Sequence, residues 1–175
     1  MLTHPTLLEI LHSHICTHAE ATHTRQSYIH TPKLHTHAVA THTAVTMAAL
    51  KPPFTIATAH QKVKFAQAMW NTCNPTQVSK GYTSDCIWRN RGQFIKGTDE
   101  IIGFLTKKWE KEQEYRLRKE LFAVGGEKEG DMNKIAVQFW YEYRDKYDGM
   151  KWKRCYGLED WTFNVSDPRL RALRG

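Results

Sequence analysis

Apolar residues follow a helical period in two segments of the chain. In the first segment they recur at spacings of three and four, which places them on one helical face: Ile56, Ala59, Val63, Ala66 and Trp70. Thr55 precedes this segment as a candidate N-cap residue. In the second segment Thr98 precedes a similar stripe, formed by Ile101, Ile102, Leu105 and Trp109. The pattern therefore predicts two long helices, one beginning near Thr55 and the other near Thr98.

Two shorter signals lie between these helices. Asn74-Pro75 is typical of a helix start, because an N-cap residue is followed by proline at the first helical position. Residues 85–91 contain the strand-like run Cys86-Ile87-Trp88, and Gly92 can turn the chain so that Phe94-Ile95 pairs with it. We therefore expect a short helix and a small hairpin before the second long helix.

From Tyr115 onward the apolar period changes to two, which is typical of β-strands. Strands are predicted over residues 115–124, 134–144 and 151–163, with glycine-containing turns between them. Helices followed by a run of antiparallel strands are the α+β pattern. We therefore predict one α+β domain over residues 47–175, with two to three N-terminal helices covering one face of a curved antiparallel sheet.

Residues 1–46 have a different composition, dominated by a repeated Thr-His pair. All ten histidines lie between His4 and His60, whereas all six tryptophans lie between Trp70 and Trp161. A packed core needs large apolar side chains, so residues 1–46 are predicted to be a disordered low-complexity leader. An extension without function is the favoured interpretation, a transit peptide is a weaker one, and the imidazoles could bind metal adventitiously.

Composition excludes several classes of function. The formal net charge is +7, but Lys and Arg alternate with Glu along most segments, which argues against a nucleic-acid surface. The four cysteines form no C-x-x-C pair, so neither a zinc site nor a redox dithiol is expected, and no cofactor is predicted. No apolar run approaches the roughly 18 residues of a membrane span, and the start lacks the basic and apolar regions of a secretory signal. We expect a cytoplasmic protein that binds neither membrane nor nucleic acid.

Six segments, taken in order, make the chain resemble an uncharacterised branch of the nuclear transport factor 2-like, or SnoaL-like, superfamily. They are Trp70-Asn71, WRNRGQFIKG (88–97), FLTKKW (104–109), YRLRKELF (115–122), IAVQFWYEYRD (135–145) and CYGLEDWTF (155–163). The resemblance covers about residues 52–165. It implies a cone-shaped α+β fold in which a bent sheet wraps around helices and leaves a pocket at the open end. Members of the superfamily include isomerases, cyclases, dehydratases and binding or dimerisation modules.

The chain departs from this pattern at its C-terminal end. The resemblance implies a long last strand that closes the sheet, but Pro168 cannot donate a ladder hydrogen bond and only residues 169–175 follow it. We therefore expect the last strand to be truncated and the sheet to be incomplete.

Strand alternation divides the predicted sheet into two faces. The face richer in aliphatic residues, which we expect to face the helices and the pocket, carries Leu117, Lys119, Leu121, Ile135, Val137, Phe139, Tyr141, Tyr143, Trp152, Arg154, Tyr156 and Leu158. The other face carries Arg118, Glu120, Gln138, Trp140, Glu142, Lys153, Glu159 and Trp161. A slip of one residue in any strand would exchange its two faces.

Polar groups on the predicted inner face are the candidates for ligand binding, because burying them is unfavourable unless they find partners. The predicted ligand-binding residues are Trp88, Asn90, Trp109, Lys119, Arg154 and Tyr156. Arg154 could hold an anionic group, while Tyr141 and Tyr156 could donate to a carbonyl or enolate oxygen. Alternatively, Arg154 pairs with a nearby carboxylate and the tyrosines only cap the core.

The choice of catalytic residues is narrow. No histidine follows His60, so a carboxylate is left as general acid or base, with Glu120 first and Asp85, Glu142 or Asp160 after it. Tyr141 is the second predicted catalytic residue. In this register Glu120 lies on the outer face, where Arg118 or a lysine could pair with it. Lys108 and Glu112 are likewise expected to pair on an outer surface, that of the second long helix.

Two functions remain open from the sequence. One is a small-molecule-binding domain, with lyase or isomerase activity on a small carbonyl or anionic compound. The other is a non-catalytic dimerisation or protein-interaction module, because Trp140 and Trp161 lie among charges on the predicted outer face like the core of an interface. A carboxylate with a raised pKa in a closed pocket would favour the enzyme. A pocket filled by Tyr and Trp side chains, with the outer sheet paired, would favour the module.

Overall fold

The computed structural model describes residues 16–17, 50–126, 128, 131–165, 167 and 169–174. Cys16–Thr17 form the short strand β1, whose backbone pairs with β6 (Lys151–Phe163) opposite Cys155 and Arg154. The rest of the predicted leader over residues 1–46 lies outside the described residues. None of the helices in the described part of the chain is both long enough and apolar enough to cross a membrane.

The helices begin close to the predicted positions. Thr55 caps α1 (Ile56–Trp70), where its hydroxyl accepts from the Thr58 backbone N–H at 3.2 Å. Asn74 caps α2 (Pro75–Ser79). The second long helix, α3 (Gly97–Lys111), begins at Gly97, one residue before the prediction. Gly97 has φ +74°, and a Cβ there would lie 2.8 Å from a backbone carbonyl oxygen of β2, so this strand-to-helix junction requires glycine.

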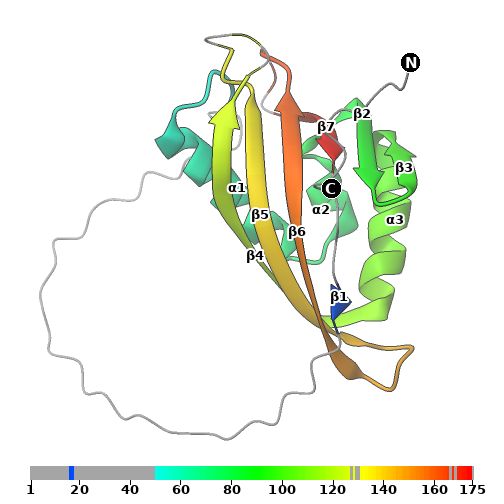
Figure 1. Ribbon diagram of the computed structural model, residues 1–175. Coiled ribbons are helices and arrows are strands. Elements are labelled where there is room, and N and C mark those ends of the chain that lie inside the picture. Colours follow the sequence, from blue (N-terminus) through cyan, green and yellow to red (C-terminus); the bar gives the residue numbers. More distant parts are fainter. Residues whose placement is uncertain are drawn as a thin grey trace, which may run out of the picture.

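The strands form one strongly curved, mostly antiparallel sheet around the helices (Figure 1). They are β2 (Tyr82–Asn90), β3 (Gln93–Lys96), β4 (Glu112–Gly125), β5 (Lys134–Asp145), β6 and β7 (Leu170–Arg174). Their order across the sheet is β3-β2-β7-β6-β5-β4. The last strand is short, as expected, but the expectation of an incomplete sheet is wrong. The short β7 lies antiparallel to β6 and parallel to β2, and so joins the two halves of the sheet after Pro168.

Polar side chains of α1 occupy the open edge of β4, the last strand in this order. The Asn71 amide that follows α1 donates to the Leu117 carbonyl at 2.9 Å and accepts from the Leu117 N–H at 2.8 Å. Gln67 accepts from the Lys119 N–H at 2.8 Å. These bonds satisfy backbone groups that an edge strand would otherwise expose, and they fix α1 across the concave side of the sheet.

The two faces of β4 and β5 are as predicted, but the prediction for β6 is wrong. Glu159 pairs with Val137 and Trp161 with Ile135, so both point to the concave side, and Trp161 is only 1% exposed. Arg154 and Tyr156 pair with Glu142 and Trp140 and point outward, as do Trp152 and Leu158. The inner face of β6 was assigned as the face with more aliphatic residues. This criterion fails because β6 buries charged groups and exposes two aromatic residues.

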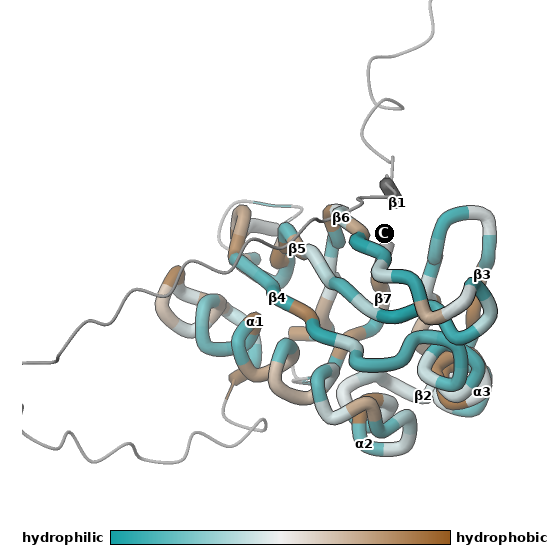
Figure 2. Tube along the Cα trace, turned by 90° about the horizontal axis from the view of Figure 1, so that it is seen from below, coloured by the Kyte–Doolittle hydropathy of each residue, from teal (hydrophilic) through white to brown (hydrophobic). Residues whose placement is uncertain are grey.

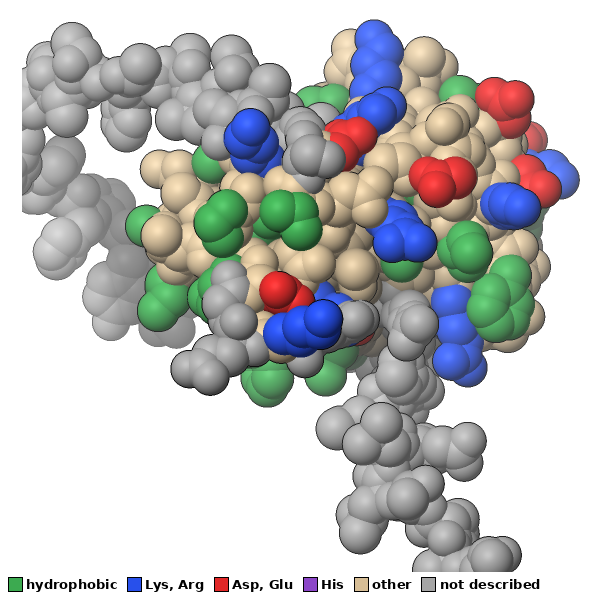
Figure 3. Space-filling model, turned by 90° about the horizontal axis from the view of Figure 1, so that it is seen from above, with side chains coloured by type: hydrophobic (Ala, Val, Ile, Leu, Met, Phe, Trp, Pro, Cys, Tyr) green, Lys and Arg blue, Asp and Glu red, His purple; other side chains and the backbone are tan. Residues whose placement is uncertain are grey.

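The core lies between the helices and the concave face. Figure 2 shows α1, α2 and α3 around the space that the curved sheet encloses. Aromatic rings fill much of it: Trp70 contacts Trp88 and Trp109 edge-on at 5.5 and 5.9 Å, and Trp88 stacks on Tyr82. On the outside, Figure 3 shows basic, acidic and hydrophobic side chains interspersed over the face seen from above. On that face the basic residues do not gather into a single patch.

Candidate functional site

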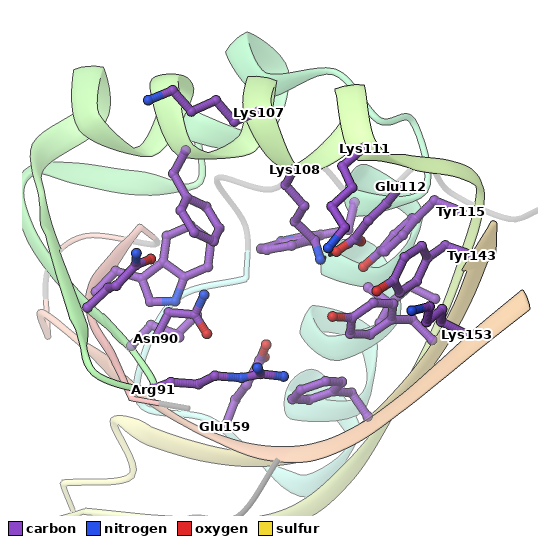
Figure 4. A pocket seen from close by; sticks show the side chains of 18 of the residues that line it. Asn90, Arg91, Lys107, Lys108, Lys111, Glu112, Tyr115, Tyr143, Lys153 and Glu159 are labelled. Atoms are coloured by element: carbon purple, nitrogen blue, oxygen red, sulfur yellow. Dashed lines mark hydrogen bonds and ion pairs between the residues drawn. The ribbon is translucent and has the colours of Figure 1, made fainter. Parts of the chain in front are cut away.

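A cavity of about 830 Å³ opens on the concave side, between α3, the β2–β3 hairpin and the strands β4 to β6 (Figure 4). Its walls are aromatic and charged. The lining residues are Trp70, Trp88, Asn90, Arg91, Gln93, Phe104, Lys107, Lys108, Lys111, Glu112, Tyr115, Leu117, Lys119, Phe139, Tyr141, Tyr143, Asp145, Lys153, Glu159 and Leu173. Six of them are lysine or arginine and three are carboxylates, so the lining favours a ligand with negative charge.

One wall of the cavity carries a lysine–glutamate pair at the junction of α3 and β4. Lys108 lies in the last turn of α3, and Glu112 is the residue at which the backbone leaves the helix. Spaced four residues apart, they share one side of the chain, and Lys108 Nζ lies 2.6 Å from Glu112 Oε2. Each side chain is 11% exposed. We call these two residues the wall pair.

Burial shifts both members of the wall pair toward their neutral forms. It lowers the pKa of Lys108, although attraction to Glu112 opposes that shift. Burial likewise raises the pKa of Glu112, against the effect of the Lys108 ammonium. Lys108 Nζ also lies 4.2 Å from the ring centroid of Tyr141. The cavity thus presents a carboxyl group and an amine, each with a pKa displaced toward the neutral range, in contact with each other.

Three tyrosines follow the wall pair along β4 and β5. Tyr141 lies between Tyr115 and Tyr143, with ring centroids 5.1 and 5.8 Å away. Burial raises the pKa of Tyr115 and Tyr141 well above the ordinary value, and it raises the pKa of Tyr143 to about 12. Their hydroxyl groups therefore stay protonated near neutral pH and can donate hydrogen bonds to a ligand oxygen.

The floor of the cavity carries a second lysine–glutamate pair, which we call the floor pair. Lys119 of β4 forms an ion pair with Glu159 of β6, and their side chains are 1% and 8% exposed. Glu159 Oε2 also accepts from Trp161 Nε1 at 2.8 Å. The Lys119 ammonium faces three rings, those of Trp70, Phe139 and Trp161, at 5.1 to 5.3 Å. Burial lowers the pKa of Lys119, while Glu159 counteracts that shift.

Charged groups also line the mouth of the cavity. Asp145 lies between Lys111 and Lys153, with oxygen–nitrogen distances of 3.3 and 3.6 Å. Lys153 also contacts Asp148 at 2.7 Å, and this hydrogen bond raises the pKa of Lys153. From the β2–β3 turn, the Arg91 side chain extends into the cavity (Figure 4). A ligand entering here passes basic groups on several sides.

The structure brings together some of the residues predicted from the sequence. Trp88, Asn90, Lys119 and Tyr141 all line the cavity. Trp109 lies behind the wall, where its ring packs edge-on against Trp70 and Tyr115, and these two rings face the cavity.

The other predicted site residues lie outside the cavity. Arg154 and Tyr156 are on the outer face of β6, and Arg154 pairs with Glu142 at 3.1 Å, which matches the alternative interpretation of that arginine. Glu120 is also outside, where its carboxylate contacts Lys64 at 2.9 Å and Arg118 at 3.0 Å. These two cations lower the pKa of Glu120. An exposed carboxylate with a lowered pKa is poorly suited to act as a general acid near neutral pH.

Three carboxylates reach the cavity, and the sequence pattern singled out none of them as a site residue: Glu112, Glu159 and Asp145. Lys108 and Glu112 were correctly expected to pair but were placed on an outer surface. Lys108 follows Phe104 by four residues, and Phe104 lines the cavity, so the helical spacing indicated the correct face for Lys108 but not for Glu112. The predicted interface core is also revised, since Trp161 belongs to the interior.

The outer face of the sheet carries a shallower hollow of about 450 Å³. It lies over β4, β5 and β6 and is lined by Arg116, Leu117, Arg118, Trp140, Tyr141, Glu142, Arg154 and Tyr156. Trp140 lies here beneath the Arg118 guanidinium group, whose carbon is 5.2 Å from the ring centroid. Trp140 therefore remains on the face where the sequence placed it.

Known structures share this architecture. A hypothetical protein with a ketosteroid isomerase-like fold from Catenulispora acidiphila, solved in complex with trimethylamine, aligns with a TM-score of 0.55 at 11% identity, over 65% of this chain and 82% of its own. An NTF2-like protein of unknown function from Burkholderia pseudomallei aligns with a TM-score of 0.54 at 16% identity, over 66% and 87%. A hexachlorocyclohexane dehydrochlorinase, type 2, aligns with a TM-score of 0.55 at 9% identity, over 68% and 83%. At these identities the likeness is one of fold.

The comparison with curated proteins gives no match. A family model described as "Protein of unknown function (DUF1348)" matches residues 52–171, which span both long helices, the cavity and nearly all of the sheet. The fold expected from the sequence resemblance, a curved sheet wrapped around helices, is thereby confirmed. The chain belongs to this DUF1348 family and has an NTF2-like fold.

Proposed function

We propose that the cavity binds a small organic anion that carries a carbonyl group, and that the chain catalyses proton transfer at the carbon next to that carbonyl, as lyases and isomerases do. The observation that carries this proposal is the wall pair: a carboxyl group with a raised pKa, 11% exposed, in the wall of a cavity of about 830 Å³. General acid–base catalysis needs such a group, with a pKa displaced toward the working pH.

The remaining lining residues support the parts of such a reaction. The basic groups at the mouth favour a carboxylate or similar anion, because the lining has more cations than carboxylates. The hydroxyl groups of Tyr115, Tyr141 and Tyr143 can donate to the carbonyl oxygen and to the negative charge that develops on it when the neighbouring proton leaves. Glu112 is then the base that takes the proton, and aromatic rings such as Trp88 and Phe139 supply apolar contacts.

The superfamily fold is compatible with this chemistry. One structural neighbour is named as a dehydrochlorinase, and another was solved with a small molecule bound. The cavity also has room for a ligand, whereas a pocket filled by its own Tyr and Trp side chains would have favoured a purely structural module.

Binding is tested by calorimetry with phenylpyruvate, a carbonyl compound with a carboxylate, and with phenylacetone, which has a methyl group in place of the carboxylate. The full chain is expected to bind phenylpyruvate more tightly, because only that compound satisfies the basic lining. Equal or absent binding of the two compounds contradicts the proposed preference for anions.

Catalysis is tested by following deuterium exchange at the methylene carbon of phenylpyruvate in heavy water by NMR. The wild-type chain is expected to accelerate exchange, and Glu112→Gln is expected to slow it by about 100- to 10,000-fold. Glu110→Gln is the matched control, because Glu110 belongs to the same turn of α3 but is 59% exposed. Exchange that is unchanged in Glu112→Gln overturns the role of this carboxylate.

The outer sheet face supports a second, compatible role, that of a homodimer contact. Trp140 lines the hollow on this face, and Trp152, Tyr156 and Leu158 are 45%, 44% and 37% exposed there. Exposed aromatic groups surrounded by charged groups are typical of an interface core with a polar rim. Sedimentation of the full chain should show a dimer that Tyr156→Asp dissociates. A monomer at all concentrations removes this proposal and leaves the cavity proposal unaffected.

A further inference from the structure

Lys108 is set apart from the other lysines of its own helix. Lys107 lines only the rim of the cavity, because its side chain is exposed and its amine points away (Figure 4). Lys111 is 45% exposed and contacts Asp145 at the mouth. Of these three lysines, Lys108 is the most buried, with only 11% of its side chain exposed. Its amine meets the cavity beside the Glu112 carboxyl group and over the Tyr141 ring.

An amine that is to attack a carbonyl carbon needs three conditions. A fraction of the amine must be unprotonated, an acid must lie close enough to protonate the departing oxygen, and the carbonyl group must be able to reach the nitrogen. Burial in the wall lowers the pKa of Lys108 and raises that of Glu112, which satisfies the first two conditions within one contact of 2.6 Å. The cavity satisfies the third, because both side chains line it.

The other inward-facing lysines lack one of these conditions. Lys119 is only 1% exposed, forms an ion pair with Glu159 and faces three aromatic rings, so its amine is less accessible to a carbonyl than that of Lys108. Lys153 is 17% exposed, but its contact with Asp148 raises its pKa and holds it as ammonium. The geometry therefore selects Lys108.

We propose that Lys108 Nζ forms an imine with the carbonyl carbon of the bound ligand, with Glu112 as the group that relays the protons. The inference rests on the proposed function and deepens it, because it names the ligand class as aldehydes and ketones, with 2-oxo acids as the charged members. The nitrogen lone pair attacks the carbonyl carbon, and the carbonyl π electrons move to oxygen. The two hydrogens of the amine leave with that oxygen as one water molecule, by way of Glu112, and a C=N bond remains.

Such an imine assists the same proton transfer. Once protonated, its nitrogen withdraws electrons from the neighbouring carbon more strongly than the ketone oxygen does, so the proton on that carbon is lost more readily. Glu112 Oε2 lies 2.6 Å from Lys108 Nζ, so the carboxylate stays close to the carbon that loses its proton. One wall pair thus supplies both the covalent electron acceptor and the base.

The experiment is reductive trapping with sodium borohydride on the full chain in the presence of phenylpyruvate, followed by peptide mapping by mass spectrometry. Borohydride adds a hydride to the imine carbon and leaves a stable secondary amine at the lysine that formed it. Lys108 is expected to carry most of the adduct, because its amine lines the cavity and burial lowers its pKa, so more of it is unprotonated. Because the wild-type chain is mapped directly, this result does not depend on any variant folding.

Two variants separate the imine from the binding site. Lys108→Arg keeps a positive charge beside Glu112 but cannot form an imine, so it is expected to lose trapping while calorimetry still detects phenylpyruvate binding. Lys80→Arg is the control, because Lys80 is exposed and is not among the residues that line the cavity, and this variant should trap as the wild type does. If the chain binds phenylpyruvate and exchanges deuterium but forms no adduct at Lys108, the imine proposal is wrong and the proposed function stands. If binding, exchange and adduct are all absent, both proposals are wrong.

Discussion

The wall pair and the floor pair are built from the same two residue types and lie in the same cavity, but their surroundings differ. In the floor pair, Lys119 and Glu159 come from different strands, and their side chains are only 1% and 8% exposed. Each also has further partners: three rings around the lysine and the Trp161 indole N–H on the glutamate. In the wall pair, the two residues are four positions apart, and each keeps one side open to the cavity.

This difference separates a structural role from a chemical one. When both members of an ion pair are almost fully buried and have further partners, removing one member leaves a buried charge behind. An ion pair with an open side can exchange its partner for a ligand, and a proton can move between its members. The comparison therefore predicts that substitutions in the floor pair mainly affect stability, whereas substitutions in the wall pair mainly affect chemistry.

The largest effect is expected from Lys119→Met, which removes one member of the floor pair. Glu159 would remain buried with only the Trp161 N–H as partner, and such a loss typically destabilises by about 3–5 kcal/mol. Urea unfolding measures the change. The double variant Lys119→Met/Glu159→Gln should recover a large part of the loss, because no charge is left behind. A single variant that loses less than about 1 kcal/mol contradicts the structural role of the floor pair.

Lys62 of α1 separates the effect of burial on a lysine from the effects of the cavity. It lies outside the cavity, 5.3 Å from the Phe163 ring centroid, and burial lowers its pKa to about 8 against the attraction of Asp167. Because this folded pKa lies below the ordinary 10.5, the unfolded chain binds more protons between these two values, and stability rises with pH in that window.

Relative to Lys62→Met, the wild type should therefore gain about 2 kcal/mol between pH 7 and about pH 9.5. Urea unfolding of both proteins at each pH measures this difference, and taking the difference cancels the titration of other groups. If the difference in unfolding free energy stays constant across this range, burial does not lower the pKa of Lys62.

A smaller loss of stability is expected from Lys108→Met in the wall pair, about 1–2 kcal/mol. Glu112 would be left without its partner, but its raised pKa allows it to take up a proton and its open side gives it access to water in the cavity. Lys107→Met, at the neighbouring exposed position, should change stability by less than about 0.5 kcal/mol. Equal losses in Lys108→Met and Lys119→Met would remove the distinction between the two pairs.

The sequence predicted the elements well because their signals are local. Thr55 and Asn74 cap the helices at which they were expected, and the period of two marks β4 and β5 with the correct faces. The faces of β6 could not be assigned in the same way, because its buried charge Glu159 is stabilised by Lys119, forty positions away in the sequence. The sequence predicted a truncated last strand but not that this strand completes the sheet, since β7 is defined by pairing with β2 and β6 rather than by its own pattern.

The candidate site was predictable only in part. Tyr141, Trp88, Asn90 and Lys119 were identified because they are polar or aromatic groups on segments expected to line the pocket. Glu112 was missed because a glutamate four residues from a lysine at a helix end is ordinarily a solvated surface pair. Only the curvature of the sheet, which brings β4 and β5 over the end of α3, turns that pair inward.

The smallest effect is expected at Glu120, the carboxylate that the sequence ranked first as a catalyst. Its contacts with Lys64 and Arg118 lie on the outer face of β4, and partly exposed pairs of this kind contribute about 0.2–1 kcal/mol. Glu120→Gln should lose no more than this amount in urea unfolding and should leave deuterium exchange into phenylpyruvate unchanged. Since Glu112→Gln removes a carboxylate from the same strand but from the cavity side, the two variants differ mainly in which face loses the charge. If Glu120→Gln slows deuterium exchange, a carboxylate outside the cavity takes part in the chemistry. That result would contradict the assignment of the reaction to the wall pair.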